Sequence, residues 1–140
     1  MIKHEKLPEN IIPLVPEAAV YLNSIPEIDF AYLFGGLVNT ELRPLSDVDI
    51  AVYFEQEADI TNVRFDILGG LNYILKTDEI DLVVLNNAPL PLAMRILSNK
   101  KLLVDKKPYV RHAYESLIMR EYFDFSFLEK SILKRRFQNG

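Results

Sequence analysis

Two stretches decide the fold class: AYLFGG at residues 31–36 and SDVDIAVYF at residues 46–54. The first apolar run ends in Gly35-Gly36, ten residues follow, and Asp47-Val48-Asp49 then opens the second run. Continuous apolar runs are typical of strands in a sheet that is covered on both faces. Because a glycine turn lets the backbone approach a ligand closely and direct amide donors at it, this turn predicts phosphate binding.

The remaining pattern predicts a small α/β domain in the order helix, strand, strand, helix, strand, helix, strand, helix. We expect strands at residues 30–34, 48–54, 80–85 and 102–104, and helices at about 16–23, at 60–75, from a start at 86–89, and from 108 onward. The central sheet is expected to be small and mixed, although the sequence alone does not order its strands. Residues 134–140 are expected to fray.

Single residues indicate local features of the predicted helices. Asp59 suits the N-cap of the 60–75 helix. Within that helix, Gly69 and Gly70 each cost about 1 kcal/mol relative to alanine, and indicate a kink or a close contact. The buried stripe of the C-terminal helix is expected to contain five apolar residues: Val110, Tyr114, Leu117, Ile118 and Leu128.

Composition narrows the class of protein. The 140 residues predict a single domain, with a core at about 16–125 and a C-terminal tail at 126–140. A net charge of −4 argues against nucleic acid as a direct partner. The absence of cysteine excludes disulfides and thiolate metal sites. Because the start lacks the apolar core of a signal peptide and no apolar run approaches about 18 residues, we expect a cytoplasmic protein without a membrane partner.

Three acidic residues predict a metal site. Asp47 and Asp49 lie one residue apart, so their side chains point to the same side of a strand. Asp81 heads the apolar run at 82–85, and joins them if its strand lies beside theirs; Asp78 and Glu79 are the alternatives. Two such charges 4 Å apart repel by about 4 kcal/mol at an effective dielectric of 20, so the site favours a counter-cation. Oxygen ligands select magnesium, or manganese.

These features together predict nucleotidyl transfer. Gly35 and Gly36 would bind the phosphates of a nucleoside triphosphate, with help from Ser46 and from a helix beginning near Leu37. Asp47, Asp49 and Asp81 would hold two metal ions, and Asp81 would also accept the proton of the attacking hydroxyl. That hydroxyl attacks the α-phosphorus and pyrophosphate leaves.

The same residues resemble the nucleotidyltransferase superfamily related to DNA polymerase β, whose signature is Gly-Ser, ten residues, Asp-x-Asp and a later third Asp. The spacing matches here, and Ser46 matches the Ser-Asp-x-Asp form, but Gly36 stands where the family has serine. The short length is similar to that of minimal nucleotidyltransferases. The stretches at 80–90 and 120–125 resemble the MntA-like antitoxins. The resemblance covers about residues 21–125.

This resemblance implies the polymerase β-like fold and a specific role. Such antitoxins pair with a HEPN-domain ribonuclease toxin and transfer AMP from ATP to a toxin tyrosine. Two alternatives stay open. The missing hydroxyl at Gly36 favours a fold that has weak or no catalysis and neutralises the toxin by binding. A small-molecule nucleotidyltransferase of the aminoglycoside type is the other. A homo- or hetero-oligomer is compatible with either role.

Overall fold

The structure of the chain is a computed structural model that describes residues 11–39 and 48–139. In chain order its elements are α1 (Ile11–Asn23), β1 (Ile28–Phe34), the 3-10 helix η1 (Gly35–Asn39), β2 (Val48–Phe54), α2 (Ile60–Leu75), β3 (Ile80–Val84), the 3-10 helix η2 (Leu85–Asn87), α3 (Leu90–Ser98), β4 (Lys100–Asp105) and α4 (Pro108–Asn139). The predicted order of helices and strands is confirmed, with two short 3-10 helices added.

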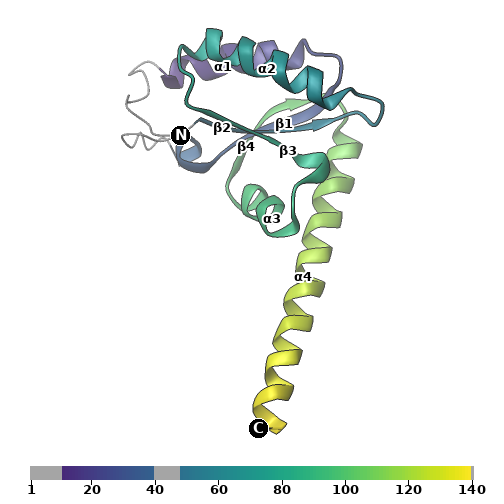
Figure 1. Ribbon diagram of the computed structural model, residues 1–140. Coiled ribbons are helices and arrows are strands. Elements are labelled where there is room, and N and C mark those ends of the chain that lie inside the picture. The colour runs from purple at the N-terminus through teal and green to yellow at the C-terminus, as the bar shows by residue number, and fades with distance from the viewer. Residues whose placement is uncertain (1–10, 40–47, 140) are drawn as a thin grey trace.

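The four strands form one mixed sheet in the order β3-β2-β1-β4 (Figure 1). β1 pairs antiparallel with both β2 and β4, whereas β2 pairs parallel with β3. Every residue of β1 is buried, as expected for a strand whose two faces are both covered. The predicted fold class, a small mixed sheet flanked by helices and followed by a C-terminal helix, is therefore confirmed.

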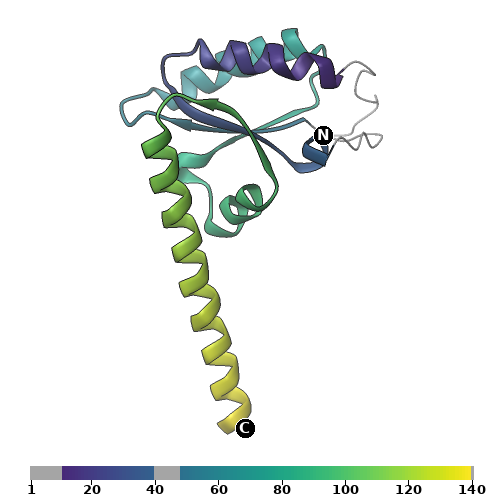
Figure 2. The same ribbon diagram turned by 180° about the vertical axis from the view of Figure 1, so that it is seen from behind.

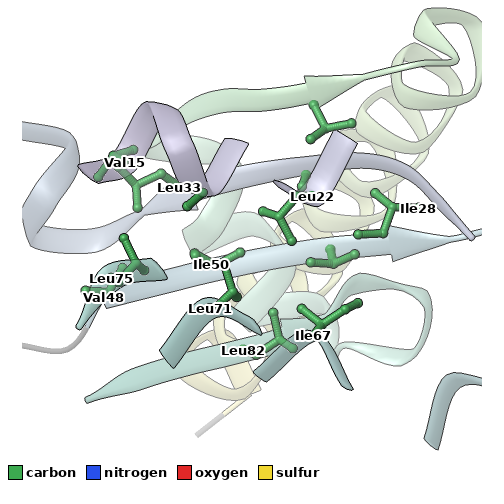
Figure 3. Close-up of a cluster of buried hydrophobic side chains, with 14 of the residues drawn as sticks. Val15, Leu22, Ile28, Leu33, Val48, Ile50, Ile67, Leu71, Leu75 and Leu82 are labelled. Carbon is green, nitrogen blue, oxygen red and sulfur yellow. The ribbon is translucent and has the colours of Figure 1, made fainter. Parts of the chain in front are cut away.

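Helices cover both faces of the sheet and create two hydrophobic cores. α1 and α2 lie on one face, and α3 with the first part of α4 lies on the other (Figures 1 and 2). Figure 3 shows the first core, where Leu22 of α1, Leu71 of α2 and Ile50 of β2 meet. Because side chains alternate along a strand, Ala51 belongs to the second core and Asp49 points to that same face.

The first helix starts earlier than the sequence predicted. It begins at Ile11, so Pro16 is the sixth residue of the helix and not part of its first turn. A proline inside a helix removes one backbone hydrogen bond. Ile11, Leu14 and Val15 are all buried against the sheet, and their burial, about 1.5–3 kcal/mol per side chain, offsets that loss.

The second helix, α2, has the predicted bounds, and its contact with α1 explains one of its two glycines. A Cβ atom on Gly70 would overlap the ring of Tyr21 on α1, whereas Gly69 faces open space. The close-contact explanation is therefore confirmed for Gly70. Asp59 occupies the N-cap position but makes no side-chain capping hydrogen bond; its carboxylate accepts one from Asn62 Nδ2 at 2.8 Å instead.

A polar network anchors the first part of α4 to the sheet. Arg111 donates two hydrogen bonds to the carboxylate of Asp105, at 2.9 and 3.0 Å. Glu115 accepts hydrogen bonds from Arg111 at 3.0 Å and from the hydroxyl of Tyr32 at 2.8 Å. Burial and the Glu115 carboxylate raise the pKa of Tyr32 above its ordinary value. Because the network joins β1, β4 and α4, it sets the direction in which the long helix leaves the sheet.

The second part of α4 extends away from the rest of the fold (Figures 1 and 2). The prediction that residues 134–140 fray is wrong for 134–139, which continue the helix. No glycine or proline interrupts residues 109–139, and Leu, Lys, Arg and Glu are strong helix formers. Of the predicted stripe, Ile118 is buried, but Leu117 and Leu128 are exposed.

Within residues 11–39 and 48–139, no helix combines the length and the apolar character that crossing a bilayer requires.

Candidate functional site

The glycine turn lies directly after β1 and is tightly constrained. Gly35 has φ = 77°, in the left-handed region that side chains disfavour. A Cβ atom at this position would also overlap the carboxylate of Asp49. The helix expected near Leu37 is the 3-10 helix Gly35–Asn39, which starts two residues earlier. Glycine at position 35 therefore serves both the turn and the close approach of an acidic side chain.

Asp49 and Asp81 lie side by side on neighbouring strands. In the parallel pairing of β2 with β3, Asp49 is directly opposite Asp81, and on its other side Asp49 pairs with Phe34 of β1. Residues opposite each other in a sheet point to the same face, so both carboxylates lie on the face that carries α3. Asp49 is half-buried and Asp81 is exposed. The condition under which Asp81 joins the site, that its strand lies beside the strand of Asp49, is met.

Two predicted site residues, Ser46 and Asp47, lie outside the described residues. Gly36 is described and is an exposed residue of η1. The catalytic, metal-binding and nucleotide-binding roles of these residues remain predictions.

A cavity of about 300 Å³ opens between the glycine turn and the C-terminal end of α3. Its described lining consists of Phe34, Gly35, Asp49, Arg95, Ser98 and Asn99. The cavity therefore brings together Gly35 and Asp49, while Asp81 lies beside Asp49 on the sheet but outside this lining. A larger cavity of about 570 Å³ lies between α2 and β3, but its lining contains no carboxylate, so the smaller one is the better candidate for the chemistry.

Sequence reasoning missed the contribution of α3. Arg95 is in the last turn of that helix, and Asn99 follows it and donates a hydrogen bond from Nδ2 to the carbonyl of Gly35 at 3.4 Å. These residues are about 60 positions away from the glycine turn in sequence, and no local pattern connects them. The only available signal was a basic residue on the polar face of a predicted helix.

The donor chemistry of the site fits a hard divalent cation. Asp49 and Asp81 offer carboxylate oxygens from adjacent positions, and oxygen donors with open coordination positions favour magnesium. Like charges opposite each other in a sheet destabilise it, so a cation between them would relieve repulsion. Two carboxylates are fewer than a closed metal site needs: in the described ranges, no group of three or more His, Cys, Asp or Glu side chains is arranged to hold a metal ion.

Comparison with solved structures shows the same fold in toxin–antitoxin complexes. A crystal structure of a toxin–antitoxin with AMP-PNP matches with a TM-score of 0.68 and 22% identity, over 85% of this chain and 95% of that chain. The structure of a tri-AMPylated Shewanella oneidensis HEPN toxin in complex with MNT antitoxin matches with a TM-score of 0.65 and 22% identity. The match covers 88% of this chain and 96% of that chain. The crystal structure of the toxin–antitoxin MntA-HepT matches with a TM-score of 0.64 and 23% identity, over 87% of this chain and 96% of that chain.

Sequence comparison identifies the family. A search of curated protein sequences gives no match. Residues 17–109 match the family described as "Polymerase beta, Nucleotidyltransferase", and this range contains the glycine turn, both described acids and Arg95. The chain therefore belongs to the polymerase β nucleotidyltransferase family.

Proposed function

We propose that this protein is a magnesium-dependent adenylyltransferase that transfers AMP from ATP to a tyrosine of a cognate HEPN ribonuclease toxin, and so acts as its antitoxin. The observation that carries the proposal is the register of Asp49 with Asp81 beside the turn at Gly35, in a nucleotidyltransferase domain. The similar complexes, one with AMP-PNP and one with an AMPylated HEPN toxin, support the nucleotide and the partner.

The chain's own residues would position the reactants. The amides of Gly35 and Gly36 would bind the phosphates, because glycine lets the backbone approach a ligand closely. Asp47, Asp49 and Asp81 would hold magnesium, which would neutralise charge on the triphosphate and lower the pKa of the attacking hydroxyl. Asp81 accepts the hydroxyl proton. The hydroxyl oxygen bonds to the α-phosphorus, the bond from that phosphorus to its bridging oxygen breaks, and pyrophosphate leaves.

The projecting part of α4 supports a protein partner of this kind. Phe123 and Phe127 are 64% and 76% exposed, and Leu128, Ile132 and Leu133 are also exposed. These side chains are spread around the helix, and large apolar side chains that are exposed outside the fold favour an interaction surface. The similar solved structures are toxin–antitoxin complexes, and the exposed side chains of α4 offer a partner of this kind a surface outside the fold.

The second candidate is an antitoxin that acts by binding alone, and Gly36 is the residue that favours it. A hydrogen bond to a charged group contributes about 1.5–3 kcal/mol, so the absence of the serine hydroxyl would slow transfer by about one to two powers of ten. Under this candidate, α4 supplies the inhibition and the acids contribute nothing to it.

Transfer of label to the toxin separates the two candidates. The purified protein is incubated with the toxin, magnesium and ATP labelled in the α-phosphate, and Asp49→Asn and Asp81→Asn are compared with wild type. Asp66→Asn, on the helix that covers the opposite face, is the matched control. We expect label on the toxin with wild type and Asp66→Asn, and at least a 100-fold loss with the two site variants. Growth rescue by Asp49→Asn without any labelling would instead establish inhibition by binding.

A further inference from the structure

Arg95 lies on the wall of the cavity that also contains Asp49 and the glycine turn. Of the described residues that line this cavity, Arg95 is the cation and Asp49 is the anion. The Arg95 side chain is exposed, and its guanidinium makes no hydrogen bond or ion pair within the described part of the chain. A free guanidinium at the rim of a cavity is available to a ligand.

The backbone at Arg95 is firmly placed relative to the glycine turn. Ala93 and Ile96, which lie on the same helix, are fully buried, and Ile96 belongs to the core on this face of the sheet. Ser98 donates a hydrogen bond from Oγ to the carbonyl of Arg95 at 2.8 Å, and Asn99 reaches the carbonyl of Gly35 at 3.4 Å. These contacts close the helix end and join it to the turn, so Arg95 and Gly35 lie on two sides of one cavity.

The charge of a nucleotide explains why a cation is needed there. Asp49 and Asp81 would hold a metal, which would supply part of the positive charge that a triphosphate needs, and a further cation of the protein would supply more. The position that supplies a hydroxyl elsewhere in the family is Gly36, so the turn contributes amides alone. Arginine binds phosphate oxygens through two parallel hydrogen bonds, which gives it both affinity and orientation.

We propose that Arg95 binds the β- and γ-phosphates of the nucleotide and holds the pyrophosphate as it leaves. This inference rests on the proposed function, and it assigns to α3 the phosphate contact that Gly36 cannot make. A purely structural role is the alternative, because a basic residue in the last turn stabilises a helix through a favourable interaction with the helix dipole. The two roles differ in one respect: a phosphate contact depends on which phosphates the ligand carries.

Nucleotide binding with magnesium, measured by calorimetry, tests the assignment. AMP-PNP and AMP are titrated into wild type, Arg95→Ala and Arg95→Lys, with Arg120→Ala, an exposed arginine on α4, as the control. We expect Arg95→Ala to weaken AMP-PNP binding by about 10- to 100-fold and to leave AMP binding unchanged. The affinity of Arg95→Lys for AMP-PNP should lie between those of wild type and Arg95→Ala, since lysine keeps the charge and loses the paired hydrogen bonds. The KM for ATP in the transfer assay should rise more than kcat falls.

The contrary results are equally distinct. AMP-PNP binding by Arg95→Ala at wild-type strength would overturn the assignment, as would an equal loss for AMP and AMP-PNP together with a lowered melting temperature. If wild type binds AMP-PNP with the expected dependence on Arg95 but labels no toxin, the proposed acceptor fails and the phosphate contact stands. If wild type labels the toxin and Arg95→Ala does so with unchanged KM, only the role of Arg95 fails.

Discussion

The carboxylate of Asp49 lies in the space that a Cβ atom on Gly35 would occupy. Asp49 lies on β2 and Gly35 directly follows β1, and the pairing of Asp49 with Phe34, the neighbour of Gly35, brings them together. The position of the Asp49 side chain therefore depends on the absence of a side chain at Gly35. A local change at the glycine should disturb the acid.

Gly35→Ala is expected to impair the site more than the fold. The left-handed φ of 77° would cost about 1–2 kcal/mol with a side chain, and the Asp49 carboxylate would have to move. Transfer activity should fall at least 100-fold, while the protein remains folded by circular dichroism. Wild-type activity in this variant would show that the carboxylate has no fixed place beside the turn.

Gly36→Ser is expected to act in the opposite direction. Of the described glycines only Gly35 has a positive φ, so the backbone conformation at Gly36 is compatible with a side chain. The new hydroxyl would add a hydrogen bond to a phosphate, and the transfer rate should rise by about one to two powers of ten. The measurement is steady-state transfer at saturating ATP. An unchanged rate would show that the hydroxyl of the family's serine has no function in this chain.

The adjacent glycines of α2 make a matched pair for stability. Gly69→Ala meets open space and should stabilise the protein by about 0.5–1 kcal/mol, because alanine is the better helix former. Gly70→Ala would force the ring of Tyr21 away and break its hydrogen bond to the carbonyl of Asp66 at 3.3 Å. Its free energy of unfolding should be about 1–2 kcal/mol below that of Gly69→Ala in urea titration. Equal stabilities would mean that the Tyr21 ring moves aside at no cost.

Exposed aromatics on α4 should matter for the partner and not for the fold. Phe127→Ser, at a side chain that is 76% exposed, should change the free energy of unfolding by no more than about 0.5 kcal/mol. Affinity for the toxin should fall by more than about 2 kcal/mol if Phe127 is a central contact. Tyr73→Ser, at an exposed aromatic on α2, is the control and should bind normally. An unaffected Phe127→Ser complex would place the interface elsewhere.

The ionisation of Tyr114 should lower the free energy of unfolding at high pH. Burial, with a smaller effect of Tyr53, raises the pKa of Tyr114 from 10.0 to about 12. Because the unfolded chain releases this proton first, the stabilisation is fully present below pH 10 and is lost as the pH rises towards 12. Tyr114→Phe should therefore lose less stability than wild type over that range in denaturant titrations. Parallel losses in the two proteins would contradict the assignment.

Much of this structure followed from local patterns. The bounds of β2 and α2 were predictable because each is a run of one periodicity between charged residues, Asp47 and Glu55 for β2 and Asp59 and Lys76 for α2. The turn at Gly35 was predictable because few residues besides glycine adopt a positive φ next to a strand. The start of α1 was not, since the burial of Ile11 on a distant sheet outweighs the local cost of Pro16.

The sequence by itself determined which residues carry the acids and the turn, because their spacing along two strands is a local property of the chain. Only the tertiary structure decided that β3 lies against β2, in the register that places Asp81 beside Asp49. It also brought Arg95 from α3 to the cavity at Gly35. Strand pairing and helix packing join residues far apart in sequence, and the burial energy that selects them belongs to the whole core.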